Sequence, residues 1–152
     1  MPQYDQRYTA GTFLIYLDRY DNGVPNGQIF HPYSGECVGF QSLTQLLLSL
    51  EQTMDLENLP QSFQSVRTFF PFTGAMGDNV DAVPRVGRLA TFALQILFRR
   101  NSSWQGSVSW LEGKQRQSFR SVLELICLMN SAMEAKRLAL PDAAPTAQLR
   151  EA

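Results

Sequence analysis

The chain has 152 residues, of which 44% are hydrophobic and 18% are charged. That length suits one domain, or two small units that fold together, and the composition excludes a chain that is disordered throughout. Because 13 basic residues stand against 14 acidic ones, the total charge excludes a strongly cationic nucleic-acid binder and a strongly acidic protein.

The start of the chain, MPQYDQRYTAG, has no apolar run behind a basic segment and is therefore unlike a signal peptide. The strongest apolar stretches, residues 46–50 and 123–129, are much shorter than the roughly 20 residues that cross a bilayer. We therefore expect a cytoplasmic protein without a membrane partner. The two cysteines, Cys37 and Cys127, are expected to be reduced thiols, since two cysteines are too few for a disulfide framework.

The residue pattern of 12–51 predicts three strands followed by a helix. Ser42 marks the start of the helix, because Gln45 three residues later completes the pattern of a capping box, in which the third residue reaches back to the N–H of the serine. The apolar face of this helix consists of Leu43, Leu46, Leu47 and Leu50.

The segment from residue 55 to residue 90 is expected to be a linker that packs on the core. Its prolines and glycines are Pro60, Pro71, Pro84, Gly74, Gly77 and Gly87. Residues 56–66 predict a short helix, residues 67–74 are apolar enough to lie across the core, and residues 77–79 predict a turn.

Residues 91–130 predict the same order of elements as residues 12–51. Apolar residues at positions 92, 94, 96 and 98 alternate along one face of a strand, and strands are also predicted at 107–111 and 115–119. Gly113 is expected to supply a positive φ in the turn between the last two strands. Ser121 and Glu124 repeat the capping box.

The two segments match without gaps when the chain is aligned with itself so that Thr12 falls on Thr91, a pairing that we call the repeat alignment. Seven of the 40 paired positions are identical, against about two or three expected by chance: Thr12/Thr91, Phe13/Phe92, Asn22/Asn101, Gly27/Gly106, Phe40/Phe119, Ser42/Ser121 and Leu46/Leu125. A unit of about 40 residues is too small to be comfortably stable alone. We therefore predict an α+β fold in which tandem β-β-β-α repeats, each a three-stranded antiparallel sheet plus a helix, pack as an intramolecular pseudo-dimer.

The predicted boundaries follow from this repeat. Residues 1–54 form the first repeat, residues 55–90 the linker, residues 91–135 the second repeat and residues 136–152 a mobile tail.

Charge is divided unequally between the predicted repeats. Residues 12–51 carry one basic and four acidic residues, a net charge of −3, whereas residues 91–130 carry five basic and two acidic residues, a net charge of +3. This asymmetry predicts a basic surface on the second repeat that meets an anionic partner. Two ordinary solvated surfaces, or attraction between the halves or between two chains, are the alternatives.

The sequence offers little for catalysis or for metal binding. His31 is the single histidine, and we interpret it as structural because it takes the strand position of Trp110 in the second repeat. One histidine and two cysteines do not make a zinc site, and no GxSxG or HExxH motif occurs. The glycines at 74 and 77 lack the Lys-Ser/Thr of a phosphate-binding loop, and Asp78 and Asp81 are interpreted as solvated acids. We therefore predict no enzyme, no metal and no cofactor.

Two resemblances suggest further functions. Residues 99–106, RRNSSWQG, contain an N-x-S-x-x-G pattern that resembles the second signature of PilZ domains, which implies a cyclic di-GMP receptor. PilZ domains also have an upstream RxxxR pair, and here Arg85 and Arg88 have one residue too few between them. The order of three antiparallel strands and a helix is similar to the AP2 and integrase arm-binding domains, which implies a sheet that contacts DNA.

The function predicted from these observations is a small intracellular, non-enzymatic binding or adaptor protein with an unknown protein partner. A DNA- or RNA-binding regulator that uses the same surface is the alternative, and a homodimer is left open. Arginine and tryptophan are favoured anchors at interfaces. The predicted contact residues lie on the sheet and turns of the second repeat and are Arg99, Arg100, Trp104, Lys114, Arg116 and Arg120.

Overall fold

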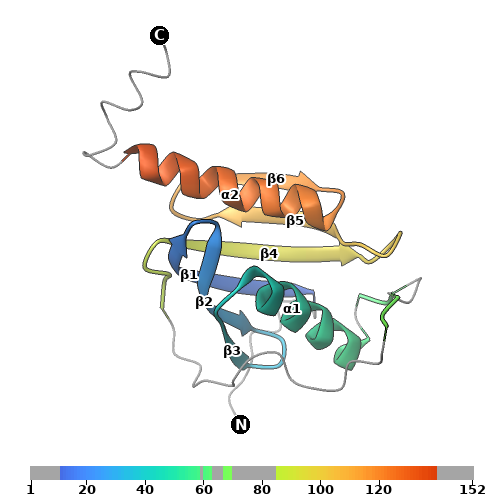
Figure 1. Ribbon diagram of the computed structural model, residues 1–152. Helices are drawn as coiled ribbons and strands as arrows, with labels where there is room; N and C mark the ends of the chain where they lie inside the picture. Colours follow the sequence, from blue (N-terminus) through green and yellow to red (C-terminus); the bar gives the residue numbers. More distant parts are fainter. Residues whose placement is uncertain (1–10, 59, 63–66, 70–84, 140–152) are drawn as a thin grey trace.

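The computed structural model describes residues 11–58, 60–62, 67–69 and 85–139. The elements in chain order are β1 (Thr12–Asp21), β2 (Val24–His31), β3 (Glu36–Phe40), α1 (Leu43–Glu57), β4 (Ala90–Phe98), β5 (Gln105–Trp110), β6 (Gln115–Phe119) and α2 (Val122–Ala139). The described strands form one antiparallel sheet in the order β3-β2-β1-β4-β5-β6 (Figure 1). The predicted α+β class, with antiparallel strands and two helices, is confirmed.

The centre of the sheet is the pair β1 and β4. Leu14 lies opposite Ala93, and the neighbouring position places Ile15 opposite Phe92. Successive side chains of a strand point to opposite faces. The alternation therefore sends Ile15 and Phe92 to one face of the sheet, and sends Tyr16 of β1 to the other.

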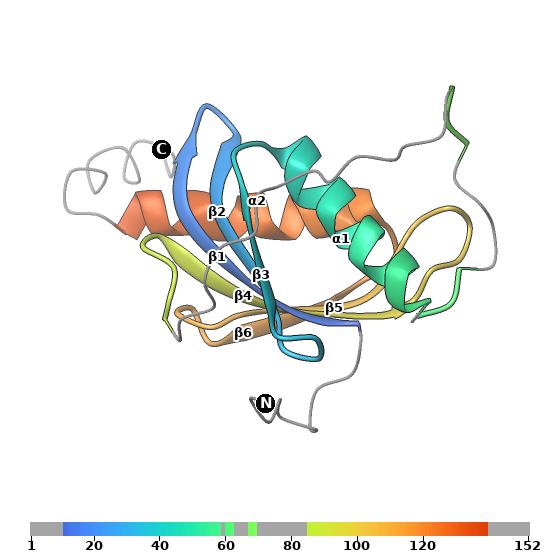
Figure 2. The same cartoon turned by 90° about the horizontal axis from the view of Figure 1, so that it is seen from below.

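Both helices cover the same face of the sheet. α1 packs on β2 and β3, and α2 packs on β5 and β6, so each helix lies over the strands that precede it in the chain (Figures 1 and 2). The side chains that meet there form one buried apolar cluster, which includes Phe13, Ile15, Leu17, Leu46, Leu50 and Met54 from the N-terminal half and Phe92, Leu94, Ile96, Leu125, Met129 and Met133 from the C-terminal half. One continuous core therefore joins the two halves.

The two helices begin with the same local geometry. The hydroxyl oxygen of Ser42 accepts the Gln45 N–H at 3.1 Å, and that of Ser121 accepts the Glu124 N–H at 3.2 Å. The side chains of Gln45 and Glu124 then accept the N–H of the residue before the serine, at 2.7 Å and 2.8 Å. The capping interactions thus form as predicted, except that the reciprocal bond reaches one residue further back than the serine itself.

The turn between β5 and β6 differs from the prediction. The residue with left-handed φ is Lys114, at +52°, whereas the φ of Gly113 lies outside that region. Gly113 is required for a different reason: a Cβ at this position would lie 2.2 Å from the nearest ring atom of Trp110. The expectation that Gly113 supplies the positive φ was therefore wrong: Lys114 has the left-handed backbone, and Gly113 leaves room for the indole of Trp110.

Only part of the segment between the halves is described. Residues 56 and 57 are the last residues of α1, and Asn58, which caps the helix, has the left-handed conformation. The rest of the expected helix over 56–66 lies largely outside the described residues. Phe69 is fully exposed, while the expected turn at 77–79, the acids Asp78 and Asp81, and residues 140–152 lie outside the described residues. Neither described helix is long and apolar enough to cross a membrane.

Candidate functional site

The six predicted contact residues fall into three environments. Arg99 and Trp104 are buried, with 2% and 5% of their surfaces exposed. Arg100 and Arg120 lie at the end of the sheet where β4 turns into β5 and β6 meets α2, and the side chain of Gln105 joins their backbones. Lys114 and Arg116 lie at the opposite end of β5 and β6. The structure therefore does not gather the six residues on one patch.

Arg99 anchors a polar cluster between the end of β4 and the end of α1. Its Nη1 lies 3.1 Å from Glu51 Oε1 and 2.6 Å from Asp55 Oδ1, and its Nε donates to the carbonyl oxygen of Pro60 at 2.7 Å. The indole N–H of Trp104 donates to the other oxygen of Glu51 at 2.5 Å. In this Arg99 cluster, the guanidinium and the indole N–H of the second half bind carboxylates of α1, so these buried side chains join the two halves. A sequence pattern could not reveal this, because the partners are separated by 39 to 53 residues.

Arg100 and Arg120 are exposed. The guanidinium of Arg100 lies over the ring of Phe98 at 4.6 Å, a favourable cation–π distance. Arg120 forms an ion pair with Glu124 at 2.7 Å. The hydrogen bonds from the Arg120 side chain and backbone lower the pKa of Glu124 to about 2. Arg120 is therefore already compensated in charge.

Arg116 lies on the sheet face opposite the helices. Its Nη2 donates to Ser107 Oγ at 3.0 Å and lies 3.4 Å from Gln95 Oε1, so it bridges β6, β5 and β4. β6 is the edge strand of the described sheet, and every side chain from Gln115 to Ser118 is exposed. Arg116, with Lys114 in the adjoining turn, therefore makes this edge cationic and polar.

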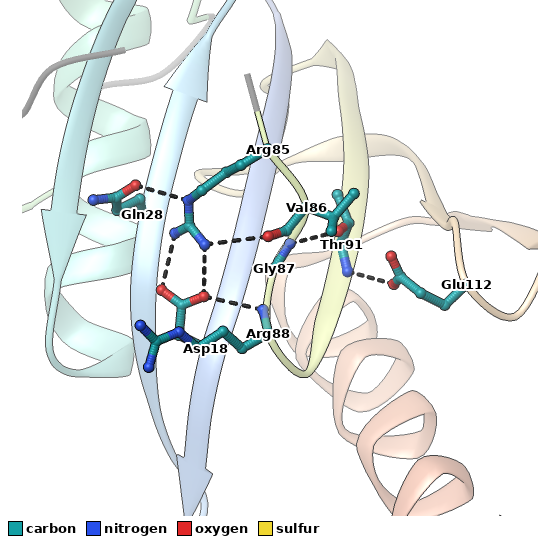
Figure 3. A network of polar contacts seen from close by, with 8 residues as sticks. All are labelled: Asp18, Gln28, Arg85, Val86, Gly87, Arg88, Thr91 and Glu112. Atoms are coloured by element: carbon teal, nitrogen blue, oxygen red, sulfur yellow. Dashed lines mark hydrogen bonds and ion pairs between the residues drawn. The ribbon is translucent and has the colours of Figure 1, made fainter. Parts of the chain in front are cut away.

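A second polar network, on the same face, holds the entrance to β4 against β1 (Figure 3). Asp18 pairs with both terminal nitrogens of Arg85, at 2.7 Å and 2.9 Å, and accepts the Arg88 N–H at 3.1 Å. Arg85 also donates to Gln28 at 3.1 Å, and its guanidinium lies 4.7 Å over the ring of Tyr16. The sequence analysis did not predict this network, because Asp18 and Arg85 are 67 residues apart. It singled out Arg85 and Arg88 for their spacing, but that spacing does not identify Asp18 as their partner.

The pKa of Asp18 shows what this network does electrostatically. Burial alone would raise it, but the hydrogen bonds from the Arg85 side chain and the Arg88 backbone, with the charges of both arginines, lower the pKa below its usual value of 3.8. Asp18 is thus held as a carboxylate. Arg85, which was compared together with Arg88 with the RxxxR pair of PilZ domains, thus forms an internal ion pair with Asp18.

The remaining titratable groups have structural environments. His31 is buried, stacks on Phe13 with ring centroids 4.7 Å apart, and its Nδ1 lies 2.8 Å from Ser34 Oγ. Cys37 is buried, which raises its pKa, and Cys127 is exposed; both are free thiols. Within the described ranges, no group of three or more His, Cys, Asp or Glu side chains lies close enough together to hold a metal ion.

Comparison of the chain with protein-family models, with curated proteins and with solved structures finds no significant match.

Proposed function

We propose first that the molecule is a fused pseudo-dimer of two β-β-β-α units related by an approximate two-fold axis. The repeat alignment supports this, because the residue that it pairs with Leu14 is Ala93, which lies opposite Leu14 at the centre of the β1–β4 ladder. The strand irregularities follow the same alignment, between Leu17 and Arg19 in β1 and between Ile96 and Phe98 in β4.

The left-handed residues support the same relation. Asn22, Gly23 and Gly35 have positive φ in the first half. Their counterparts in the repeat alignment, which are Asn101, Ser102 and Lys114, have positive φ in the second.

Contacts between the halves are reciprocal in the way a two-fold axis requires. Tyr20, at the end of β1, donates its hydroxyl to Asn130 of α2 at 2.5 Å. In the repeat alignment, the counterparts of these two residues are Arg99 and Glu51, which also bond to each other, at 3.1 Å. Each central strand therefore reaches the helix of the other half, as partners do across an isologous dimer interface.

We propose further that this pseudo-dimer is a non-enzymatic binding protein whose partner-contacting surface is the β6 edge. The observation that carries the proposal is the run of exposed side chains on an edge strand, with Arg116 on the strand and Lys114 beside it. An edge strand presents backbone N–H and C=O groups to which an extended segment can add. The cations favour an acidic partner segment, and the engagement of His31 and Asp18 in internal contacts favours binding over catalysis.

Nucleic acid is the second candidate, and one observation favours it. Gln95, Ser107 and Arg116 form a polar array across β4, β5 and β6 on the face that the helices leave uncovered. Side chains of these types donate to phosphates and to base edges. Binding of this kind would weaken steeply as the salt concentration rises.

Affinity capture from a native lysate, scored for proteins and for nucleic acids, tests the proposal. The full chain should retain a protein that is lost when Lys114 and Arg116 are changed to Glu. The control is Arg67→Glu, which reverses the charge of one exposed arginine outside the edge, half the charge change of the double variant. Retention of the same molecules by all three proteins would exclude the β6 edge as the contact surface. If the full chain retains nucleic acid and the double variant does not, the result supports the second candidate, nucleic-acid binding, instead of a protein partner.

A further inference from the structure

A pocket of about 130 Å³ lies between α2 and the last two strands, β5 and β6. Phe92, Val108 and Trp110 form its apolar wall on the side of the sheet, and Leu128 and Ala132 form it on the side of the helix. A cavity of about 150 Å³ engineered in another protein holds a benzene molecule. This pocket, which we call the β6 pocket, therefore has room for one bulky apolar side chain.

The β6 pocket lies under the flank of α2 that faces away from the first half. Its helical lining includes Leu128, Ser131 and Ala135, which share one flank because they are three and four positions apart. Asn130 lies on the other flank, where it accepts the hydroxyl of Tyr20 in β1. The lining flank therefore faces β6, the edge strand, as the course of α2 over β5 and β6 shows (Figure 1).

The edge strand presents its side chains alternately to the pocket and to the helix-free face of the sheet. Gln115 and Gln117 line the pocket and are exposed, whereas Arg116 between them lies on the helix-free face. A segment that adds to β6 alternates in the same way, since successive side chains of a strand point to opposite faces. One of its side chains therefore lies at the β6 pocket, and the residues before and after it lie on the face of Arg116.

In the second half, room for a side chain and positive charge occur at the same edge, and both differ from the first half. In the repeat alignment, Lys114 and Arg116 correspond to Gly35 and Cys37, so these two cations belong to the second half. Small residues of α2 that line the pocket correspond to larger residues of α1: Ser131, Ala132 and Ala135 correspond to Gln52, Thr53 and Leu56.

We propose that the β6 pocket receives a leucine or phenylalanine side chain of an extended partner segment that adds to β6, and that acidic residues flank this side chain in the segment. The inference rests on the proposed function of the β6 edge and specifies the partner. The flanking carboxylates meet Arg116 and Lys114. A second copy is a poorer occupant, because pairing β6 with β6 would bring the cations of both copies together, and like charges on paired strands are destabilising.

Fluorescence anisotropy with two labelled peptides and the full chain tests the proposal. The Phe peptide is Gly-Glu-Thr-Glu-Phe-Glu-Thr-Gly, and the Ala peptide has alanine in place of the phenylalanine. The Phe peptide should bind at least about tenfold more tightly, because burial of its ring removes apolar surface from water.

Variants of the protein separate the pocket from the charged edge. Ala135→Phe places a ring at the pocket, so it should weaken the Phe peptide by about tenfold and leave the Ala peptide within about twofold. The control Cys127→Phe enlarges an exposed residue of α2 outside the pocket and should leave both affinities within about twofold. Arg116→Glu should weaken both peptides by a similar factor, since the two peptides carry the same charges.

The outcomes distinguish this inference from the proposed function of the edge. Equal affinities for the two peptides, both weakened by Arg116→Glu, would overturn the inference and support the edge alone. Equal losses of the Phe peptide in Ala135→Phe and Cys127→Phe would also overturn it. Binding of neither peptide at about 1 mM would overturn both proposals.

A photo-crosslinking p-benzoylphenylalanine at position 117 identifies the occupant, because Gln117 lines the pocket at the edge strand. Crosslinks to the Phe peptide support the proposal. Crosslinks to a second copy, or to residues 140–152 of the same chain, that persist in the presence of the peptide would overturn it, since the pocket would then be filled by the protein itself.

Discussion

Arg99 illustrates how burial changes the meaning of a residue. From the sequence it is one of several cations on a basic segment, but its guanidinium is 2% exposed and holds Glu51, Asp55 and the Pro60 carbonyl. Removing the guanidinium takes a donor away from the half-buried Glu51 carboxylate and from the Pro60 carbonyl oxygen, whereas the Asp55 side chain is exposed to water. We expect Arg99→Ala to lower the free energy of unfolding by about 2–4 kcal/mol, measured by urea denaturation.

The neighbouring residue provides the matched control for Arg99. Arg100 is exposed, and its guanidinium contacts Phe98 at the surface. We expect Arg100→Ala to change stability by less than about 0.5 kcal/mol. Equal losses in the two variants would contradict a structural role specific to Arg99.

The turn between β5 and β6 allows a test with two adjacent residues. A side chain at Gly113 would collide with Trp110, whereas Lys114 has a left-handed φ that glycine adopts more easily. We expect Gly113→Ala to destabilise the protein by about 1–3 kcal/mol and Lys114→Gly to stabilise it by about 0.5–1 kcal/mol. Thermal unfolding followed by circular dichroism measures both. A Gly113→Ala variant as stable as the wild type would contradict the collision with Trp110, and a loss of stability in Lys114→Gly would contradict a strained backbone at Lys114.

At the scale of elements, the helix starts are local devices whose contribution can be compared directly. Ser42 and Ser121 each accept the N–H of the residue three positions on. We expect Ser42→Ala and Ser121→Ala each to cost about 1 kcal/mol, measured as a shift of the urea midpoint at constant slope. Ser131→Ala, in the body of α2, is the control and should cost less, since no helix end depends on it.

The Asp18–Arg85 pair connects β1 with the segment that enters β4, and it predicts a pH dependence. The folded-state pKa of Asp18 is lowered, so its contribution to stability is present at neutral pH and is lost as the pH falls through that lowered pKa. We expect Asp18→Asn to be less stable than the wild type at about pH 7, and the difference to shrink towards about pH 3. Urea unfolding at several pH values measures this; a difference that stays constant with pH would contradict the ion pair.

At the scale of the whole molecule, one core shared by both halves predicts one cooperative transition. Both tryptophans, Trp104 and Trp110, lie in the second half, so their fluorescence reports on that half, whereas far-UV circular dichroism reports on both. We expect Phe13→Ala in β1 to cost about 3–5 kcal/mol and to move both signals to the same lower midpoint. A fluorescence midpoint that stays at the wild-type value would show that the halves unfold separately.

The sequence by itself determined what depends on near neighbours. Strand alternation, the serine caps and the helix faces are written in short spacings along the chain, and the structure confirms the α+β class with its strands and two helices. The repeat alignment was also visible, and the two-fold arrangement that it predicts stays a proposal supported by the strand register.

Only the tertiary structure decided which polar side chains remain available. Arg99 and Trp104 looked like surface anchors, and they became buried because Glu51, Asp55 and Pro60, all far away in sequence, converge on them. Arg85 likewise forms an ion pair with Asp18 of β1, which is far from it in the sequence. Whether a charged side chain is solvated, paired or buried depends on which distant segments pack against it. The order of residue types along the chain does not show which of these segments come close together in space.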